Sequence, residues 1–216
     1  MYIDKVIAPG EAGALGLFYQ WGRKDPFLGS SSIHFDDIVE AKSTITWPSA
    51  VSTSSSRGTV SYVTANPTTF VTASSSPYDW HYSSRDNSLW TTSDKAKSIY
   101  DPCPAGWRVP DGGSNGVWLK AKASGSPSDF YHTYSSSNKG MNFSGEFGSA
   151  STIWYPASGY LYGGGAGLSH VGYGYYWSAS PDDLEAYYLS HGRKSDVNPS
   201  YSIARAYGLA VSCLQE

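Results

Sequence analysis

The segment Ile99-Tyr100-Asp101-Pro102-Cys103-Pro104-Ala105-Gly106-Trp107-Arg108-Val109-Pro110 lies near the middle of the chain and holds the first of its two cysteines. The second, Cys213, lies far downstream, and this spacing excludes a CxxC redox or zinc motif. Two interpretations stay open: two unrelated buried thiols, or one long-range disulfide. Composition favours the disulfide, because low charge with abundant Ser, Thr, Tyr, Trp and Gly is common in exported proteins, whose compartments preserve such bonds.

Downstream of that segment, the last third of the chain has the residue pattern of β-strands. Residues 173–180 and 186–190 are rich in rings, and Pro181-Asp182-Asp183 lies between them, so they predict the two strands of a hairpin. The closing run, residues 205–213, alternates bulky with small side chains. It predicts a strand whose small side chains face outward and whose bulky side chains pack against the core. The bulky face is made by Tyr207, Leu209, Val211 and Cys213.

The N-terminal half predicts short elements separated by Ser-rich loops. Residues 13–22 predict a ring-rich strand or extended core segment, and residues 66–71 predict a turn and a short strand. Residues 59–64 alternate with period two and predict another strand. Helices should be few, and one is predicted over residues 117–123 with Ser114 as its N-cap.

Rings and charges are equally frequent in these 216 residues, each at 15%. The charged share is well below the roughly 25% of an average domain. A net charge of -3 with 40% hydrophobic residues excludes a disordered chain, and no apolar run is long enough to span a membrane. Lys+Arg is 15 against Asp+Glu 18, so nucleic acid is not an expected partner. Without a repeat or a linker, residues 1–216 are predicted to form one domain with an α+β fold, β-rich and loop-rich with few short helices.

Five segments, taken together, resemble a known family. They are residues 16–27, the segment 99–110, residues 155–160, residues 174–180, and residues 205–208 with 211–213. In this order they resemble the C-terminal domain of fimbrillin-family surface proteins of Bacteroides-type bacteria, which is related to the fibrobacter major-paralogous-domain family. The run DPCPAGWRVP is the most specific of the five, and the resemblance extends from Gly16 to Cys213.

This resemblance implies a C-type-lectin-like α+β fold in an exported protein that is extracellular and associated with the cell surface or outer membrane. It also implies a Cys103–Cys213 disulfide and a role in adhesion or pilus-associated binding, without catalytic residues or a cofactor. No signal peptide is visible after Met1, so the residues alone leave two alternatives, a cytosolic protein or an excised mature domain. With the resemblance, we expect a domain excised from a longer exported protein. One departure is clear: relatives often place a Glu before the Trp that follows the GWRVP run, and here only Trp118 is present.

Tyrosines near the glycine-rich run 163–167 are the candidate ligand-binding residues. A ring offers an apolar face to the C–H side of a sugar, and the phenol hydroxyl offers a polar contact. The alternative is that half of these rings belong to the core, as the alternation of side chains along a strand demands. Both interpretations can be true, because one face of a strand can pack against the core while the other is exposed. The loop 160–165 and the tips near Tyr173 are the more exposed candidates; the set is Tyr160, Tyr162, Tyr173 and Tyr175.

Two other groups of residues have structural and functional interpretations. Trp107 and Arg108 resemble a ligand clamp, but an Arg between Trp and Val-Pro beside a possible disulfide favours a structural ion pair, and we place both residues, with Trp177, in the structural set. Carboxylates suit calcium, which lectin-like folds often bind, yet a solvated hairpin turn is the favoured interpretation and no metal is expected. The weak calcium candidates are Asp182, Asp183 and Glu185.

We therefore expect a non-enzymatic surface module that binds a glycan or host protein. The alternative is a structural pilus or tip subunit that contacts other subunits. An enzyme ranks last, because the five histidines form no HExxH motif and no GxSxG is present. An oxidase of the formylglycine-generating type, which the implied fold class includes, would need a free cysteine pair to hold copper.

Overall fold

The computed structural model describes residues 15–28, 49–82, 85–91, 94, 96–121, 131–144, 153–192 and 197–216. Strands predominate in these ranges, and the two α-helices found there are short. The prediction of a β-rich α+β fold is confirmed at this level. Within the same ranges, no helix has the length and apolar character needed to cross a membrane.

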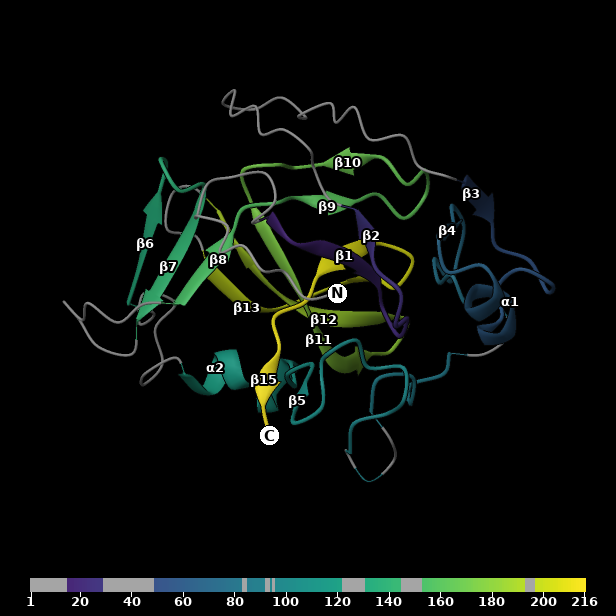
Figure 1. Ribbon diagram of the computed structural model, residues 1–216, viewed down its shortest axis with the longest axis horizontal. Coiled ribbons are helices and arrows are strands. Elements are labelled where there is room, and N and C mark those ends of the chain that lie inside the picture. The colour runs from purple at the N-terminus through teal and green to yellow at the C-terminus, as the bar shows by residue number, and fades with distance from the viewer. Residues whose placement is uncertain are drawn as a thin grey trace.

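A large sheet forms the centre of the described part of the chain (Figure 1). Its strand order is β10–β9–β14–β11–β12–β13, and β1 joins through β14 while pairing with β2 on its other side. Most neighbours are antiparallel, but β11 and β14 run parallel. The strands are β1 (Leu17–Gln20), β2 (Phe27–Leu28), β9 (Tyr160–Leu161), β10 (Leu168–Ser169), β11 (Gly174–Asp182), β12 (Glu185–His191), β13 (Val197–Ala204) and β14 (Gly208–Ala210).

Smaller elements flank this sheet. Figure 1 shows the antiparallel β6–β7–β8 sheet at the left end, and the parallel β3–β4 pair with α1 at the right end. Below the sheet lie α2 and the β5–β15 pair, next to the C-terminus. The elements are β3 (Ser49–Ser52), α1 (Val60–Ala65), β4 (Thr69–Thr72), β5 (Trp107–Arg108), the 3-10 helix η2 (Gly113–Asn115), α2 (Val117–Ala121), β6 (Tyr131–Ser135), β7 (Gly140–Ser144), β8 (Ile153–Pro156) and β15 (Leu214–Gln215).

The predicted hairpin of the last third is confirmed. Strands β11 and β12 pair antiparallel, with Trp177 opposite Tyr188 and Tyr176 opposite Leu189. Asp183 supplies the turn in the left-handed region, at φ 46°, which Asp tolerates better than most residues. Because neighbouring residues point to opposite faces, Trp177 enters one core cluster and Tyr176 enters another on the other side of the sheet.

The closing strand differs from its prediction. Leu209 is fully buried, as expected, but Ala210 and Ala206 on the supposed outward face are buried too. The reason is position: β14 lies between β1, β9 and β11, and the sheet carries a core on each face. Small residues on this strand therefore mark close packing rather than exposure to solvent.

Residues 59–64 were predicted as a strand, and this prediction is wrong. They form the N-cap and first five residues of α1, because Thr59 Oγ1 accepts from the Tyr62 backbone N–H at 3.1 Å. Val60 and Val63, three residues apart, both face the main core cluster. Asn66 closes the helix by donating from its side chain to the Tyr62 carbonyl at 2.9 Å.

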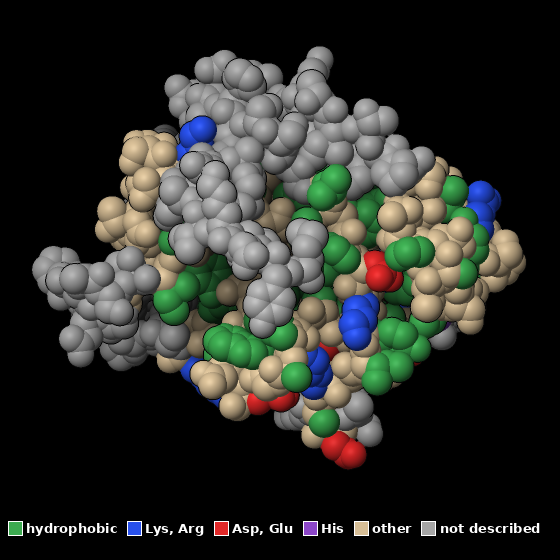
Figure 2. Space-filling model, viewed as in Figure 1, with side chains coloured by type: hydrophobic (Ala, Val, Ile, Leu, Met, Phe, Trp, Pro, Cys, Tyr) green, Lys and Arg blue, Asp and Glu red, His purple; other side chains and the backbone are tan. Residues whose placement is uncertain are grey.

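The predicted helix over residues 117–123 is present as α2 for the residues that are described. Ser114 does not cap it directly, since it lies within η2, which precedes the helix. The predicted short strand within residues 66–71 and the strand within residues 13–22 correspond to β4 and β1. Among the described residues on the face shown in Figure 2, charged side chains are few and hydrophobic side chains reach the surface in several places, as the composition suggests.

Candidate functional site

The segment 99–110 is built around one buried carboxylate, that of Asp101, which is 1% exposed. Its two oxygens accept from the backbone N–H groups of Cys103 at 2.8 Å and Val109 at 2.9 Å. The Lys97 ammonium lies 3.6 Å from the same carboxylate and donates to the carbonyl oxygens of Cys103, Pro104 and Trp107. The ion pair between the buried Asp101 and Lys97 therefore fixes the backbone of this loop from Cys103 to Val109 through hydrogen bonds.

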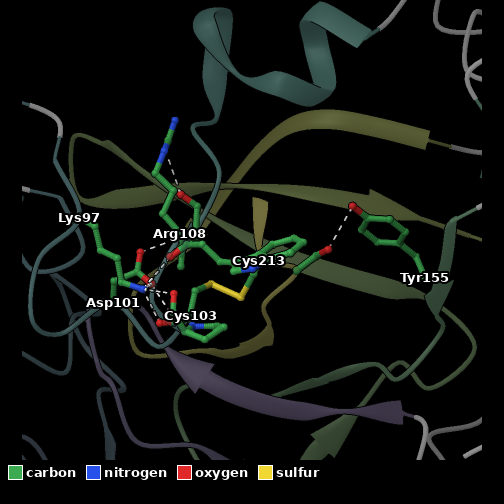
Figure 3. Close-up of a disulfide and its surroundings, with 10 residues drawn as sticks. Lys97, Asp101, Cys103, Arg108, Tyr155 and Cys213 are labelled. Atoms are coloured by element: carbon green, nitrogen blue, oxygen red, sulfur yellow. Dashed lines mark hydrogen bonds and ion pairs between the residues drawn. A yellow bond between two sulfur atoms is a disulfide. The ribbon is translucent and has the colours of Figure 1, made fainter. Parts of the chain in front are cut away.

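The predicted disulfide is confirmed. Cys103 and Cys213 are bonded across 110 residues with a Cα–Cα distance of 5.8 Å, and no described cysteine is free. Figure 3 shows Lys97, Asp101 and Arg108 on one side of this bond and Tyr155 on the other. The bond joins the loops that enter β5 and β15, so it supports the pairing of these two short strands.

Three residues were predicted to be structural, and two of them, Trp177 and Arg108, make structural contacts. Trp177 is fully buried and donates from its indole N–H to the Tyr19 carbonyl at 2.8 Å. Arg108 forms an ion pair with Asp111 at 3.0 Å, with both side chains partly exposed. Placing Trp107 in the core is wrong, since it is 40% exposed. Its strand, β5, has two residues and pairs only with β15 among the described strands, outside the main sheet.

The four tyrosines predicted as ligand candidates lie together in one group of rings. Tyr160 contacts the edge of Tyr175 with centroids 5.0 Å apart, and it stacks on His170, also at 5.0 Å. Tyr173 joins through His170 at 6.4 Å. The structure adds further members through Tyr207, Tyr188 and Tyr201. This tyrosine cluster comprises Tyr160, Tyr162, Tyr173, Tyr175, Tyr188, Tyr201, Tyr207 and His170.

Sheet geometry explains why residues so distant in sequence meet. Tyr175 lies two residues before Trp177 on β11, so both point to the same face. Trp177 is opposite Tyr188, and Tyr188 is opposite Tyr201 on β13, which continues the row across three strands. Tyr160 on β9 reaches the same row from the other side. The cluster is thus the outer continuation of the main hydrophobic core, against which Tyr160, Tyr175 and Tyr207 pack.

Exposure in the tyrosine cluster is graded. Tyr201, Tyr162 and Tyr173 are 53%, 48% and 44% exposed, while Tyr188 is buried at 9%. Burial, followed by the neighbouring tyrosines, raises the pKa of Tyr188 and of Tyr207 to about 12. These two phenols are therefore neutral at physiological pH. The cluster has a fixed base and exposed ring tips.

The loops that carry the cluster are held in unusual backbone conformations. Ala166 and His170 have left-handed φ values of 59° and 53°. Gly159, just before Tyr160, has φ 76°, and a Cβ there would lie 2.3 Å from the Ser169 carbonyl oxygen. His170 Nδ1 is 2.7 Å from Ser169 Oγ. Such conformations persist only where the surroundings fix them, so these rings are positioned rather than loosely displayed.

The carboxylates proposed for calcium each have a separate partner. Asp183 pairs with Arg85 at 3.0 Å, and Glu185 accepts from the Ser202 hydroxyl at 2.6 Å. Asp182 is hydrogen-bonded to the Tyr187 hydroxyl. In the parts of the chain that the structure describes, no three His, Cys, Asp or Glu side chains come close enough to hold a metal ion. The calcium alternative therefore lacks a ligand set here.

Sequence reasoning missed half of the tyrosine cluster. Tyr188 lies in a strand that was predicted, so period-two counting from the hairpin would have placed it on the face of Tyr175. Tyr201 and Tyr207 depend on the pairing of β13 and on the turn after it, which no local pattern specifies. His170 enters only because its loop turns back over Tyr160.

The comparisons with known proteins leave the family open: the chain matches no protein-family model, no curated protein and no solved structure. The resemblance to fimbrillin-family surface proteins remains a prediction from sequence.

Proposed function

We propose that this protein is a non-enzymatic, carbohydrate-binding module of a cell-surface adhesion protein, and that the tyrosine cluster is its binding face. The observation that carries the proposal is the unbroken set of ring contacts from Tyr162 to Tyr201, buried at its base and exposed at its tips. A host protein displaying such sugars is the natural partner.

The chemistry of the cluster suits a sugar. Rings with one free face pack against the C–H side of a pyranose, and phenol hydroxyls satisfy its hydroxyl groups. Tyr188 and Tyr207 are neutral at physiological pH, and the carboxylate of Glu185, which helps to raise the pKa of both phenols, lies near enough to disfavour an anionic ligand. A neutral glycan is therefore the ligand class that we propose, rather than a sialylated or sulfated one.

Two further features support a surface location, and with it the C-type-lectin-like assignment that the sequence resemblance implies. The Cys103–Cys213 disulfide is of the kind that persists outside the cytoplasm. Few of the described side chains on the face in Figure 2 are charged, which is compatible with a protein that works against other surfaces.

A glycan array with the purified chain tests the proposal. Binding to neutral glycans is expected, and Tyr201→Ala should weaken it about fivefold, because loss of one stacking ring removes on the order of 1 kcal/mol. Tyr82→Ala is the matched control, since Tyr82 is also 53% exposed and has no ring contact with the cluster among the described residues. Equal loss in both variants, or no binding to any glycan, would overturn the proposal.

A pilus or tip subunit is the second candidate, and one observation favours it. Strand β13 is at the edge of the main sheet and pairs only with β12 among the described strands. A free edge is the surface that strand addition uses. Pro199 within β13 removes one donor and limits that surface. Concentration-dependent self-association without glycan binding would favour this function.

A further inference from the structure

A cavity of about 210 Å³ lies apart from the tyrosine cluster and shares no residue with it. Its walls come from the turn after β1, from α1, and from the start of the segment 99–110. Apolar side chains, including Val60, Val63 and Trp80, line most of it, and the charged lining residues are Arg23, Lys24 and Asp25. Figure 2 shows hydrophobic side chains close to basic and acidic ones on the side of this face that lies toward α1 in Figure 1.

Arg23 is a buried cation, and none of the described acidic residues pairs with it. Its residue is 2% exposed, and its guanidinium lies over the Phe27 ring at 4.9 Å. The Nε has no hydrogen-bond partner, and no ion pair of Arg23 is found among the described residues. The other two nitrogens donate only to neutral oxygens, those of the Gln20 side chain and the Thr69 and Pro67 backbones.

The second buried arginine among the described residues, Arg205, has a carboxylate close to it, unlike Arg23. Arg205 is 1% exposed, and the carboxylate of Asp79, itself buried, lies 3.9 Å from it. Burial lowers the pKa of Arg23 to about 10, with Asp25 acting in the opposite direction. The positive charge beside the cavity is thus desolvated and only weakly compensated, which creates a field that favours an anion in the cavity.

The rim of the cavity adds a direct contact group. Lys24 is exposed, and its ammonium donates to the Ile99 carbonyl at 3.2 Å, so its side chain reaches across to the segment that forms the opposite wall. Arg23, Lys24 and Asp25 together carry one net positive charge. A ligand with one negative charge neutralises the lining, and an apolar body fills the rest.

We propose that this cavity binds a small carboxylate that carries an apolar group. Lys24 contacts the carboxylate, Arg23 supplies the field behind it, and Val60 and Val63 contact the apolar body. A free organic acid and the C-terminal residue of a peptide share this chemistry. The site is independent of the glycan-binding proposal.

Titration with 3-phenylpropionate, followed by NMR of the Val60 and Val63 methyl groups, tests this directly. The neutral analogue 3-phenylpropionamide should bind about five- to tenfold more weakly, because charge-assisted contacts are about twice as strong as neutral ones. The peptide Gly-Gly-Phe, with a free and with an amidated C-terminus, distinguishes a peptide end from a free organic acid.

Two charge variants should move the affinity in opposite directions. Lys24→Met should weaken binding about three- to fivefold, and Asp25→Asn should tighten it about two- to threefold, as expected for partly exposed charges. Thr64→Trp, at an exposed lining position on α1, should fill the cavity and abolish the methyl shifts. If Thr64→Trp does not fold, the methyl shifts of the unmodified protein still locate the site.

Three outcomes would overturn the proposal. They are equal affinity for the acid and its amide, the same direction of change in both charge variants, and no methyl shift at millimolar 3-phenylpropionate in folded protein.

Discussion

The segment 99–110, with its flanking residues Lys97 and Asp111, and the tyrosine cluster are stabilised by different kinds of interaction. In the segment, an internal carboxylate, a lysine and a disulfide fix a loop whose Trp is left at the surface. In the cluster, rings pack on rings, and the exposed tips, Tyr162, Tyr173 and Tyr201, come from three separate stretches of sequence. The most specific sequence motif therefore serves the scaffold, while the candidate binding face has no motif.

Removal of the disulfide should have the largest effect on stability among the tests of this comparison. The Cys103→Ser/Cys213→Ser double variant should lose about 4–5 kcal/mol of unfolding free energy, because the bond closes a loop of 110 residues. Urea unfolding measures this loss. Glycan binding by the fraction that is still folded should not change. A free-thiol assay on denatured, unreduced protein should find no thiol; two thiols would contradict the bond.

The next effect is at Asp101. Asp101→Asn removes the charge that accepts two backbone N–H groups and faces Lys97, and about 3 kcal/mol of stability should be lost. Arg108→Gln is the matched control within the same segment. Its ion pair with Asp111 is partly exposed, so a loss of at most about 1 kcal/mol is expected. Equal losses in thermal unfolding would show that the internal carboxylate is not what organises the loop.

A smaller effect concerns the base of the tyrosine cluster at alkaline pH. Burial raises the pKa of Tyr188 to about 12 in the folded protein, against about 10 when unfolded. Between these values the unfolded chain gives up the proton first, so stability falls as pH rises from about 10 to about 12. The loss should approach about 2 kcal/mol. Tyr188→Phe should reduce the slope of that part of the pH–stability curve, while the similar contribution of Tyr207 remains. An unchanged slope would contradict the assignment.

The smallest expected effect separates binding from folding. Tyr162→Ala and Tyr201→Ala should each change unfolding stability by no more than about 0.5 kcal/mol, because these side chains are about half exposed. Their effect should instead appear in glycan affinity. Thermal unfolding beside a binding titration makes the comparison. A stability loss as large as that of Asp101→Asn would show that the exposed rings belong to the scaffold.

Local sequence patterns succeeded where local geometry decides the outcome. The β11–β12 hairpin followed from two ring-rich runs around Pro181-Asp182-Asp183, and β1 and β4 followed from similar signals. The Cys103–Cys213 bond was one of two open interpretations from the residues, and the structure decided between them. The candidate tyrosines were found because rings beside glycines are visible in sequence.

Long-range packing decided the rest. Residues 59–64 alternate like a strand, yet Thr59 and Asn66 cap them as a helix that sets Val63 into a distant core. Ala210 does not face water, because a core cluster packs on each face of the sheet at β14. Tyr201 and Tyr207 join the tyrosine cluster only through the register of β13 and the turn after it. The sequence by itself determined which residues alternate, turn and carry rings, since those properties depend on neighbours in the chain. Only the tertiary structure decided which faces are buried and which rings meet, because burial depends on what the rest of the chain places beside them.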